Sequence, residues 1–160
     1  MNKGKKRISL AEARPDLAQQ WHPTKNGELR PEDVTEKSGK RVWWLLPHDD
    51  PETGAHFDFE WKAKISNRAN GRGCPYLVGN AVWPGYNDLA SKRPELAKEW
   101  HPTKNRKLTP DQVPVTSGRK VWWHCSKCGY VWRAAIYSRT EKGSDCPQCA
   151  KNRGKNNAEE

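Results

Sequence analysis

The sequence lacks long apolar segments. No run of 18 apolar residues occurs anywhere in the chain, and the basic N-terminal residues MNKGKK are not followed by an apolar stretch. A membrane-spanning helix needs about 20 mostly apolar residues, and a secretory signal needs an apolar core. The sequence therefore predicts neither, and we expect a cytoplasmic protein with no membrane partner.

Large apolar side chains are also scarce. Hydrophobic residues make up 34% of the 160 residues, with one methionine and two phenylalanines, while charged residues make up 30%. This balance favours two small modules over one large core, and small modules usually need a metal, disulfides or very good packing. The nine tryptophans must supply much of each core. Exposed indole rings would alternatively suit base stacking.

Acidic residues are outnumbered by basic ones. The chain has 29 lysines and arginines against 19 acidic residues, which gives a formal net charge of +10 and a pI near 9.5. Such an excess favours a polyanionic partner, with nucleic acid ahead of an anionic surface. Solubility alone is the alternative explanation of the charge.

The cysteines are few and odd in number. Five are present, which argues against a framework held entirely by disulfides, and paired cysteines in a reducing compartment indicate metal binding. Two C-x2-C pairs, Cys125 with Cys128 and Cys146 with Cys149, are separated by 17 residues. This spacing predicts one tetrahedral, structural Zn²⁺ with no open position for a substrate. Iron bound by four thiolates and a redox dithiol are the alternatives, and the expected strand context disfavours both.

An internal repeat divides the chain. Residues 14–34 align without gaps on residues 93–113, with 13 of 21 positions identical and the segment WHPTKN in both. A repeat of this kind indicates duplicated structural units. The predicted boundaries are 1–78 for the first unit, 79–85 for a connection, 86–152 for the second unit and 153–160 for a flexible tail. Eight of the nine tryptophans pair between the units: Trp21, Trp43, Trp44 and Trp61 with Trp100, Trp122, Trp123 and Trp132.

Each unit is predicted to be a small α+β module. A short helix opens it, capped by Ser9 in the first unit and by Asn87 or Asp88 in the second. Two strands flank the cysteine knuckle, a loop follows the second strand, and a short C-terminal helix ends the unit. Because adjacent strand residues face opposite sides, one ring of each Trp-Trp pair should be core and the other should lie at the surface. The histidine, threonine and asparagine of WHPTKN are predicted to form a turn.

The first unit has lost most of the metal ligands. Leu46 and Leu77 stand where the second unit has its first and last cysteines, and only Cys74 remains. His48, His56 and Cys74 are a conceivable alternative ligand set. The leucines favour a packed core in place of the metal, so we expect the first unit to keep the fold without zinc.

These residues resemble a known family. WHPTKN followed by VWWHCSKCGYVW and DCPQC is similar to the treble-clef or zinc-ribbon zinc-finger repeat family, over nearly the whole chain. Its members occur in bacteria, their phages and some plants, often as tandem arrays, and some are joined to a domain similar to very-short-patch-repair endonucleases. The resemblance implies two tandem zinc-finger repeats and a nucleic-acid partner. The first unit departs from the pattern, so a zinc site is not implied there.

Basic side chains near the strands are the candidate nucleic-acid contacts. The predicted function is non-catalytic binding of nucleic acid, foremost double-stranded DNA. A DNA-binding role would place the protein at the nucleoid. An arginine that ties a loop to backbone carbonyls is the alternative role for the pair Arg68 and Arg139. A protein–protein adaptor, binding of structured RNA, and a His–metal-finger nuclease are the rival functions, and no small-molecule substrate is expected. The candidate contacts are Lys40, Arg41, Lys62, Lys64, Arg68, Arg72, Arg119, Lys120, Arg133, Arg139 and Lys142.

Overall fold

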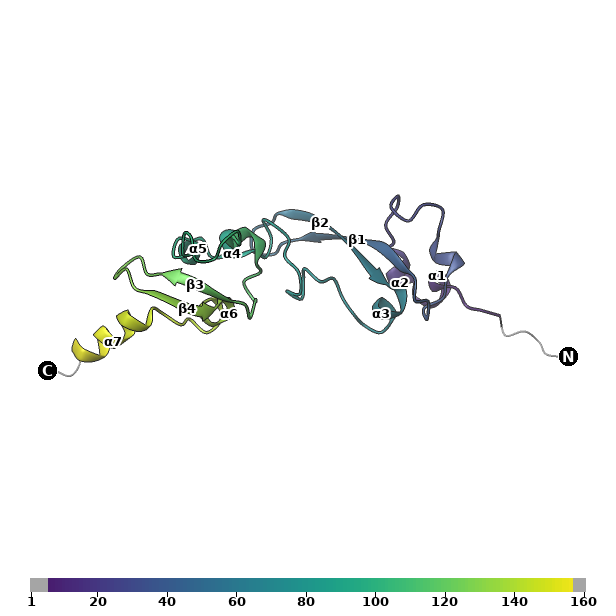
Figure 1. Ribbon diagram of the computed structural model, residues 1–160. Helices are drawn as coiled ribbons and strands as arrows, with labels where there is room; N and C mark the ends of the chain where they lie inside the picture. Colours follow the sequence, from purple (N-terminus) through teal and green to yellow (C-terminus); the bar gives the residue numbers. More distant parts are fainter. Residues whose placement is uncertain (1–5, 157–160) are drawn as a thin grey trace. The chain divides into compact units, whose positions relative to one another are not determined.

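The chain divides into two compact units, each built on one antiparallel hairpin (Figure 1). The computed structural model describes residues 6–156. The units comprise Met1–Val78 and Gly79–Glu160. Within the described residues, no helix is long and apolar enough to cross a membrane.

The same order of elements occurs in both units, as the sequence repeat requires. The first unit contains α1 (Leu10–Ala13), α2 (Pro15–Ala18), a 3-10 turn (Pro31–Asp33), β1 (Arg41–Asp49), β2 (His56–Lys64) and α3 (Ile65–Ala69). The second contains α4 (Leu89–Lys92), α5 (Pro94–Ala97), a 3-10 turn (Pro110–Gln112), β3 (Lys120–His124), β4 (Val131–Ala135), α6 (Ile136–Thr140) and α7 (Pro147–Asn156). The chain is therefore a small α+β protein with two hairpin sheets.

The helical segment that opens each unit is split in two. Ser9 caps α1 and Asp88 caps α4, and each side chain accepts a hydrogen bond from the amide three residues on, at 3.2 and 2.9 Å. Arg14 and Arg93 then interrupt the helix with φ of −138° in both units. Each arginine precedes a proline, whose ring disfavours the helical conformation of the residue before it.

Alternation along the first strand of each unit divides the Trp-Trp pair between two faces. Trp44 and Trp123 are completely buried, whereas Trp43 and Trp122 are half-buried on the opposite face. This confirms the prediction that one ring of each pair belongs to the core. The core around Trp123 consists of Leu89, Val113, Val121 and Ile136, and the buried counterparts in the first unit are Leu10, Val34, Val42 and Ile65.

The WHPTKN segment closes the free edge of the first strand. The Asn105 side chain acts like a strand residue, because its Oδ1 accepts from the Trp122 amide and its Nδ2 donates to the Trp122 carbonyl, both at 2.8 Å. Asn26 makes the same two bonds to Trp43 at 2.7 and 2.9 Å. The histidine of each segment accepts bonds from backbone amides two and three residues on. The predicted turn-forming role is confirmed for the histidine, whereas the asparagine bonds the edge of the first strand instead of its own turn.

Three sequence-based predictions of local structure were wrong. The residues after the second strand form α3 and α6 instead of a loop, because an isoleucine and an arginine three positions apart are both buried in each helix. The predicted C-terminal helix is α7 in the second unit, but residues 75–78 of the first unit form turns. Residues 153–156 of the predicted flexible tail belong to α7, and residues 157–160 lie outside the described residues.

The predicted connection, residues 79–85, is held by the second unit. The Asn87 side chain accepts a hydrogen bond from the Trp83 amide at 2.7 Å and donates to the Ala81 carbonyl at 2.8 Å. Asp88 accepts from the Gly85 amide at 2.6 Å. These bonds make the segment an N-terminal extension of α4.

Replacing Asn105 with alanine tests the role of WHPTKN in the fold. The change leaves the Trp122 amide without its partner at a half-buried position, whereas the Trp122 carbonyl keeps the hydrogen bond from the His101 amide at 3.0 Å. We therefore expect a loss of about 1–3 kcal/mol in the free energy of unfolding. Urea denaturation followed by tryptophan fluorescence measures it. Thr103→Ala is the control, because Thr103 is an exposed residue of the same segment. Equal stabilities of the two variants would contradict the assignment.

Candidate metal centre

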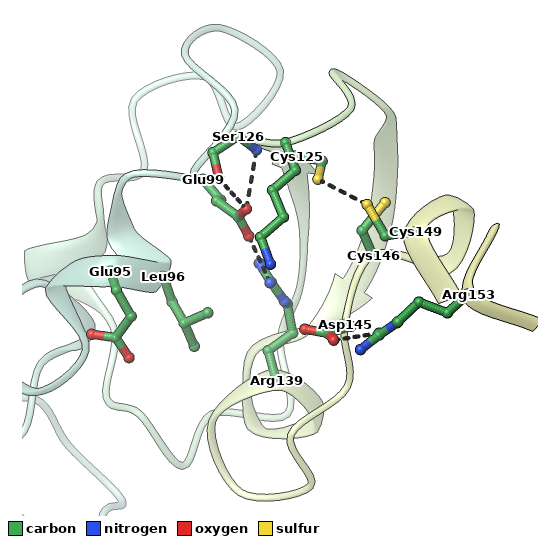
Figure 2. A pocket seen from close by; sticks show the side chains of 11 residues that line it. Glu95, Leu96, Glu99, Cys125, Ser126, Arg139, Asp145, Cys146, Cys149 and Arg153 are labelled. Carbon is green, nitrogen blue, oxygen red and sulfur yellow. Dashed lines mark hydrogen bonds and ion pairs between the residues drawn. The ribbon is translucent and has the colours of Figure 1, made fainter. Parts of the chain in front are cut away.

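The four predicted cysteines of the second unit come together in space. Figure 2 shows three of them, Cys125, Cys146 and Cys149. The Cys125 and Cys149 sulfurs lie 3.7 Å apart, the Cys128 and Cys146 sulfurs 3.6 Å apart, and all four lie within 4.8 Å of one another. A tetrahedral ion with Zn–S bonds of about 2.3 Å requires sulfurs separated by about 3.8 Å. The cluster is therefore suited to a zinc ion. Among the described residues, it is the one group of three or more potential ligands that could hold a metal.

Local backbone structure presents each cysteine pair. After β3, the Cys125 amide donates to the Tyr130 carbonyl at 2.9 Å, and the Gly129 amide donates to the Cys125 carbonyl at 3.0 Å. Gly129 has a φ of 71°, a left-handed conformation that glycine adopts without strain. The second pair lies at the start of α7, where Pro147 occupies the first helical position after Cys146. A tight turn and a helix start thus supply two thiols each.

The knuckle favours ionisation of its first thiol. Burial of Cys125 opposes the thiolate, but hydrogen bonds from the Cys128 and Lys127 amides, together with those from the Cys128 and Cys149 thiols, outweigh it and lower the pKa of Cys125 to about 7. Zinc binds the thiolate form, so these amides assist binding. Four sulfur ligands would complete the coordination of the ion, which corresponds to a structural role and leaves no open position for water or substrate.

A buried ion pair adjoins the knuckle (Figure 2). The Glu99 carboxylate accepts hydrogen bonds from the Ser126 amide and hydroxyl at 3.0 and 2.8 Å and from Arg139 at 2.6 Å. Burial raises the pKa of Glu99, but the bonds from Ser126 and Arg139 outweigh this effect and keep that pKa below its ordinary value. Because Ser126 lies between the first two cysteines, Glu99 connects the metal knuckle to α6.

In the first unit, aromatic side chains occupy the place of the cysteine cluster. Phe59 is completely buried, and the rings of Tyr76, His48 and Phe57 lie 5.4, 5.5 and 5.9 Å from it. The Tyr76 hydroxyl also donates to the backbone carbonyl of Glu60 at 3.0 Å. The tilted contact of Phe59 with Tyr76 thus joins the hairpin to the segment after α3, where the second unit uses thiols.

The alternative ligand set of the first unit is not assembled. His56 is exposed and forms hydrogen bonds with Asp49 at 2.6 Å and Asp58 at 3.2 Å, whereas Cys74 is buried. Within residues 6–156, His48, His56 and Cys74 do not form a group that could hold a metal ion.

Comparison with known families agrees with this geometry. The family described as "Probable Treble clef zinc finger domain" matches residues 17–76 and 96–152. The chain belongs to this family. A knuckle on a hairpin, followed by a second cysteine pair at a helix start, is the arrangement found in its second treble clef repeat. The match to the first repeat holds although three ligand cysteines are missing there. A comparison with curated proteins finds no match.

Most of the predicted nucleic-acid contacts are exposed, but the two arginines shared by the repeats are not. Arg68 and Arg139 are only 6% and 4% exposed, and each donates to a backbone carbonyl, of Arg72 at 2.9 Å and of Ser144 at 3.2 Å. Their burial does not support the assignment to a nucleic-acid surface and favours the alternative, in which they tie the loop to the core. The exposed candidates are Lys40, Arg41, Lys62, Lys64, Arg72, Arg119, Lys120, Arg133 and Lys142.

Sequence reasoning missed the residue that pairs with the buried arginine. Glu99 bonds Arg139 in the second treble clef repeat, and the aligned Gln20 bonds Arg68 in the first through its side-chain carbonyl. The signal was present in the alignment, because a carboxylate at one position matches an amide at the other. Recognising it required knowing that the arginines are buried.

Replacing Cys146 with serine should release zinc and unfold the second unit. The change removes one of four ligands and leaves the module without its metal, and structural zinc sites contribute directly to folding. Native mass spectrometry should find one zinc per wild-type chain and none in the variant. The aligned Cys74→Ser is the matched control and should retain the metal. Tightly bound zinc in the Cys146 variant would contradict the assignment.

Replacing Gln20 with glutamate should stabilise the first unit. Burial lowers the pKa of Arg68, and among the described residues no carboxylate lies within ion-pairing distance of it. A carboxylate at position 20 would reproduce the Glu99–Arg139 pair, and we expect a gain of about 1–2 kcal/mol. Hydrogen exchange over residues 6–78 measures it, with the exposed Gln19→Glu as a control for charge. Equal or lower protection than in the control would refute this expectation.

Proposed function

We propose that the protein binds nucleic acid, preferentially double-stranded DNA, without catalysing a reaction on it. The contacts are the outward faces of the two hairpins, opposite the buried tryptophans, and one structural Zn²⁺ stabilises the second unit. The observation that carries the proposal is an arrangement found in both units, in which exposed cations surround a half-buried tryptophan.

The outward face of the second hairpin carries the simpler version of this arrangement. Lys120 and Trp122 lie on the same side of β3, and Arg133 is directly opposite Trp122 on β4. The ammonium group of Lys104, from WHPTKN, lies 4.5 Å from the centre of the Trp122 ring. This cation–π contact holds the charge at the surface. Because Lys104 lies over the ring, the tryptophan supports a cation here, and base stacking is not needed to explain it.

The outward face of the first hairpin repeats the pattern with one acidic addition. Lys62 lies opposite Trp43, and the ammonium group of Lys25 lies 4.8 Å from the centre of that ring. Lys25 also forms an ion pair with Glu60, whose place in the second unit is taken by Val131. The second unit therefore presents the less compensated positive surface.

These cations are available for phosphate. Within the part of the chain that the structure describes, Lys25 of the WHPTKN segment has a carboxylate within 4.0 Å, but the lysines and arginines of the hairpins do not. Exposed, unpaired lysines and arginines on a rigid surface suit contacts with the phosphate backbone, which position a protein on a duplex without selecting its sequence. Two such faces on one chain would add avidity. Arg41 donates a hydrogen bond to the Lys62 carbonyl at 3.3 Å, and Lys104 lies over the Trp122 ring. The exposed cations of these faces without a carboxylate partner are Lys40, Arg41, Lys62, Lys64, Lys104, Arg119, Lys120 and Arg133.

A protein–protein adaptor is the second candidate function. Strands β1 and β2 have nine residues each against five in β3 and β4, so the first hairpin extends further from its core. Near its end, the side chains of Asp49 and Asp58 are 81% and 60% exposed. An acidic hairpin end would repel phosphate but would suit a basic protein surface.

A salt series of DNA binding tests the proposed function. In the double variant Lys120→Ala with Arg133→Ala, we expect weaker duplex binding and a slope of log K against log salt that is smaller by about 2 in magnitude, because two phosphate contacts are lost. Lys37→Ala with Lys98→Ala removes the same charge from exposed positions outside the hairpins and is the control.

The outcomes separate the candidate functions. Equal slopes for the two double variants would remove the hairpin face from the proposal. Tighter binding of a matched RNA would replace DNA as the partner. Binding of the wild-type protein that is no stronger than that of an unrelated protein of equal charge would favour the adaptor.

A further inference from the structure

A cavity of about 430 Å³ lies beside the cysteine cluster (Figure 2). Cys125, Cys146 and Cys149 line it from one side, and Glu99 and Arg139 from another. Charged side chains of the two signs occur in equal number around it: Lys127, Arg139 and Arg153 against Glu95, Glu99 and Asp145.

One donor of Arg139 has no partner. The side chain is 4% exposed, its Nε donates to the Ser144 carbonyl and its Nη2 to Glu99, but its Nη1 has no hydrogen-bond partner among the described residues. A buried donor left without an acceptor costs about 1–3 kcal/mol. Such a group in a well-packed module calls for an explanation, and the nearby sulfur ligands suggest one.

Charge decides between two candidate partners for this donor. A free anion such as phosphate would enter a cavity whose positive and negative side chains are already equal in number. It would also lie next to a zinc tetrathiolate with a net charge of −2. Repulsion from the thiolates therefore disfavours an added anion. The tetrathiolate itself requires positive charge and hydrogen-bond donors around its sulfurs, and a buried guanidinium supplies both.

The first unit offers an internal comparison. It keeps the arginine, as Arg68, but has lost three ligand cysteines and carries Gln20 in place of Glu99. The carboxylate is thus found in the unit that has the knuckle, where it accepts both hydrogen bonds from Ser126. The Nε of Arg68 also has no hydrogen-bond partner among the described residues, so an unpaired donor occurs in both units. The carboxylate and its bonds to the knuckle are what distinguish the second unit.

We propose that Arg139 is a positioning residue of the zinc site. Its guanidinium offsets the negative charge of the zinc-bound thiolates, and Glu99 holds this guanidinium and the knuckle loop in one arrangement through Ser126. The zinc site of the second unit therefore extends beyond its four ligands to an outer layer made of Glu99 and Arg139.

Zinc affinity of the full chain tests this proposal. For Arg139→Met we expect an affinity roughly 10–100-fold weaker in competition with a chromophoric chelator, because losses of this size follow removal of outer partners of metal ligands. Arg139→Lys should recover part of the loss, because it restores the charge. Arg68→Met is the matched control and should leave zinc affinity unchanged. With Co²⁺ in place of zinc, the sulfur-to-cobalt charge-transfer band should shift to longer wavelength in Arg139→Met.

Two results would overturn the proposal. One is wild-type zinc affinity together with a wild-type cobalt spectrum in folded Arg139→Met. The other is thermal stabilisation by inorganic phosphate in the wild-type protein but not in Arg139→Met, which would assign the unpaired donor to an anion. If Arg139→Met does not fold, Ser126→Ala decides, since it removes only one bond to Glu99. Faster zinc release in that variant supports the proposal, and an unchanged rate contradicts it.

Discussion

A buried guanidinium between two indole rings is the interaction on which both units depend. Arg68 lies 5.1 and 5.0 Å from the ring centres of Trp44 and Trp61, and Arg139 lies 4.6 and 5.0 Å from the corresponding rings in the second unit. Cation–π contacts of this kind contribute about 2 kcal/mol when they are shielded from water. The rings belong to the two strands of the hairpin, whereas the arginine belongs to the short helix that follows. The contact therefore fixes the direction of the chain after the second strand, and with it the segment that carries Cys74 or Cys146.

The two units complete this arrangement by different chemistry. A module of this size has too small a core to be stable without an additional constraint. The second unit gathers four thiols suited to zinc, and the first packs the rings of Tyr76, His48 and Phe57 around Phe59. The longer strands of the first hairpin provide positions for two of these rings, at residues 48 and 57. Loss of the cysteines therefore did not require loss of the fold, in agreement with the family match to both repeats.

The sequence predicted much of the fold and less of the site. The repeat, the helix caps, the division of the Trp-Trp pairs and the gathering of the four cysteines depend on local patterns or on spacing, which a sequence displays directly. The burial of Arg68 and Arg139 depends on contacts between residues distant in sequence, and the charge of arginine suggested a surface. The placement of Lys104 over Trp122 likewise joins residues 18 apart, through an edge pairing that no periodicity indicates. Short helices such as α3 and α6 were missed because tertiary contacts of two side chains, rather than helix propensity, hold them.

The WHPTKN segment connects the fold to the proposed surface without involving the metal. Its asparagine holds the backbone of the half-buried tryptophan, and its lysine lies over the ring of that same residue. One short segment thus fixes the strand edge and places a cation at the centre of the outward face. The first unit keeps both functions of the segment although three of its four ligand cysteines are missing. If partner binding required zinc, we would not expect the outward arrangement in a unit that lacks three of the zinc ligands. Its presence there supports a binding surface that belongs to the hairpin, with zinc serving only the stability of the second unit.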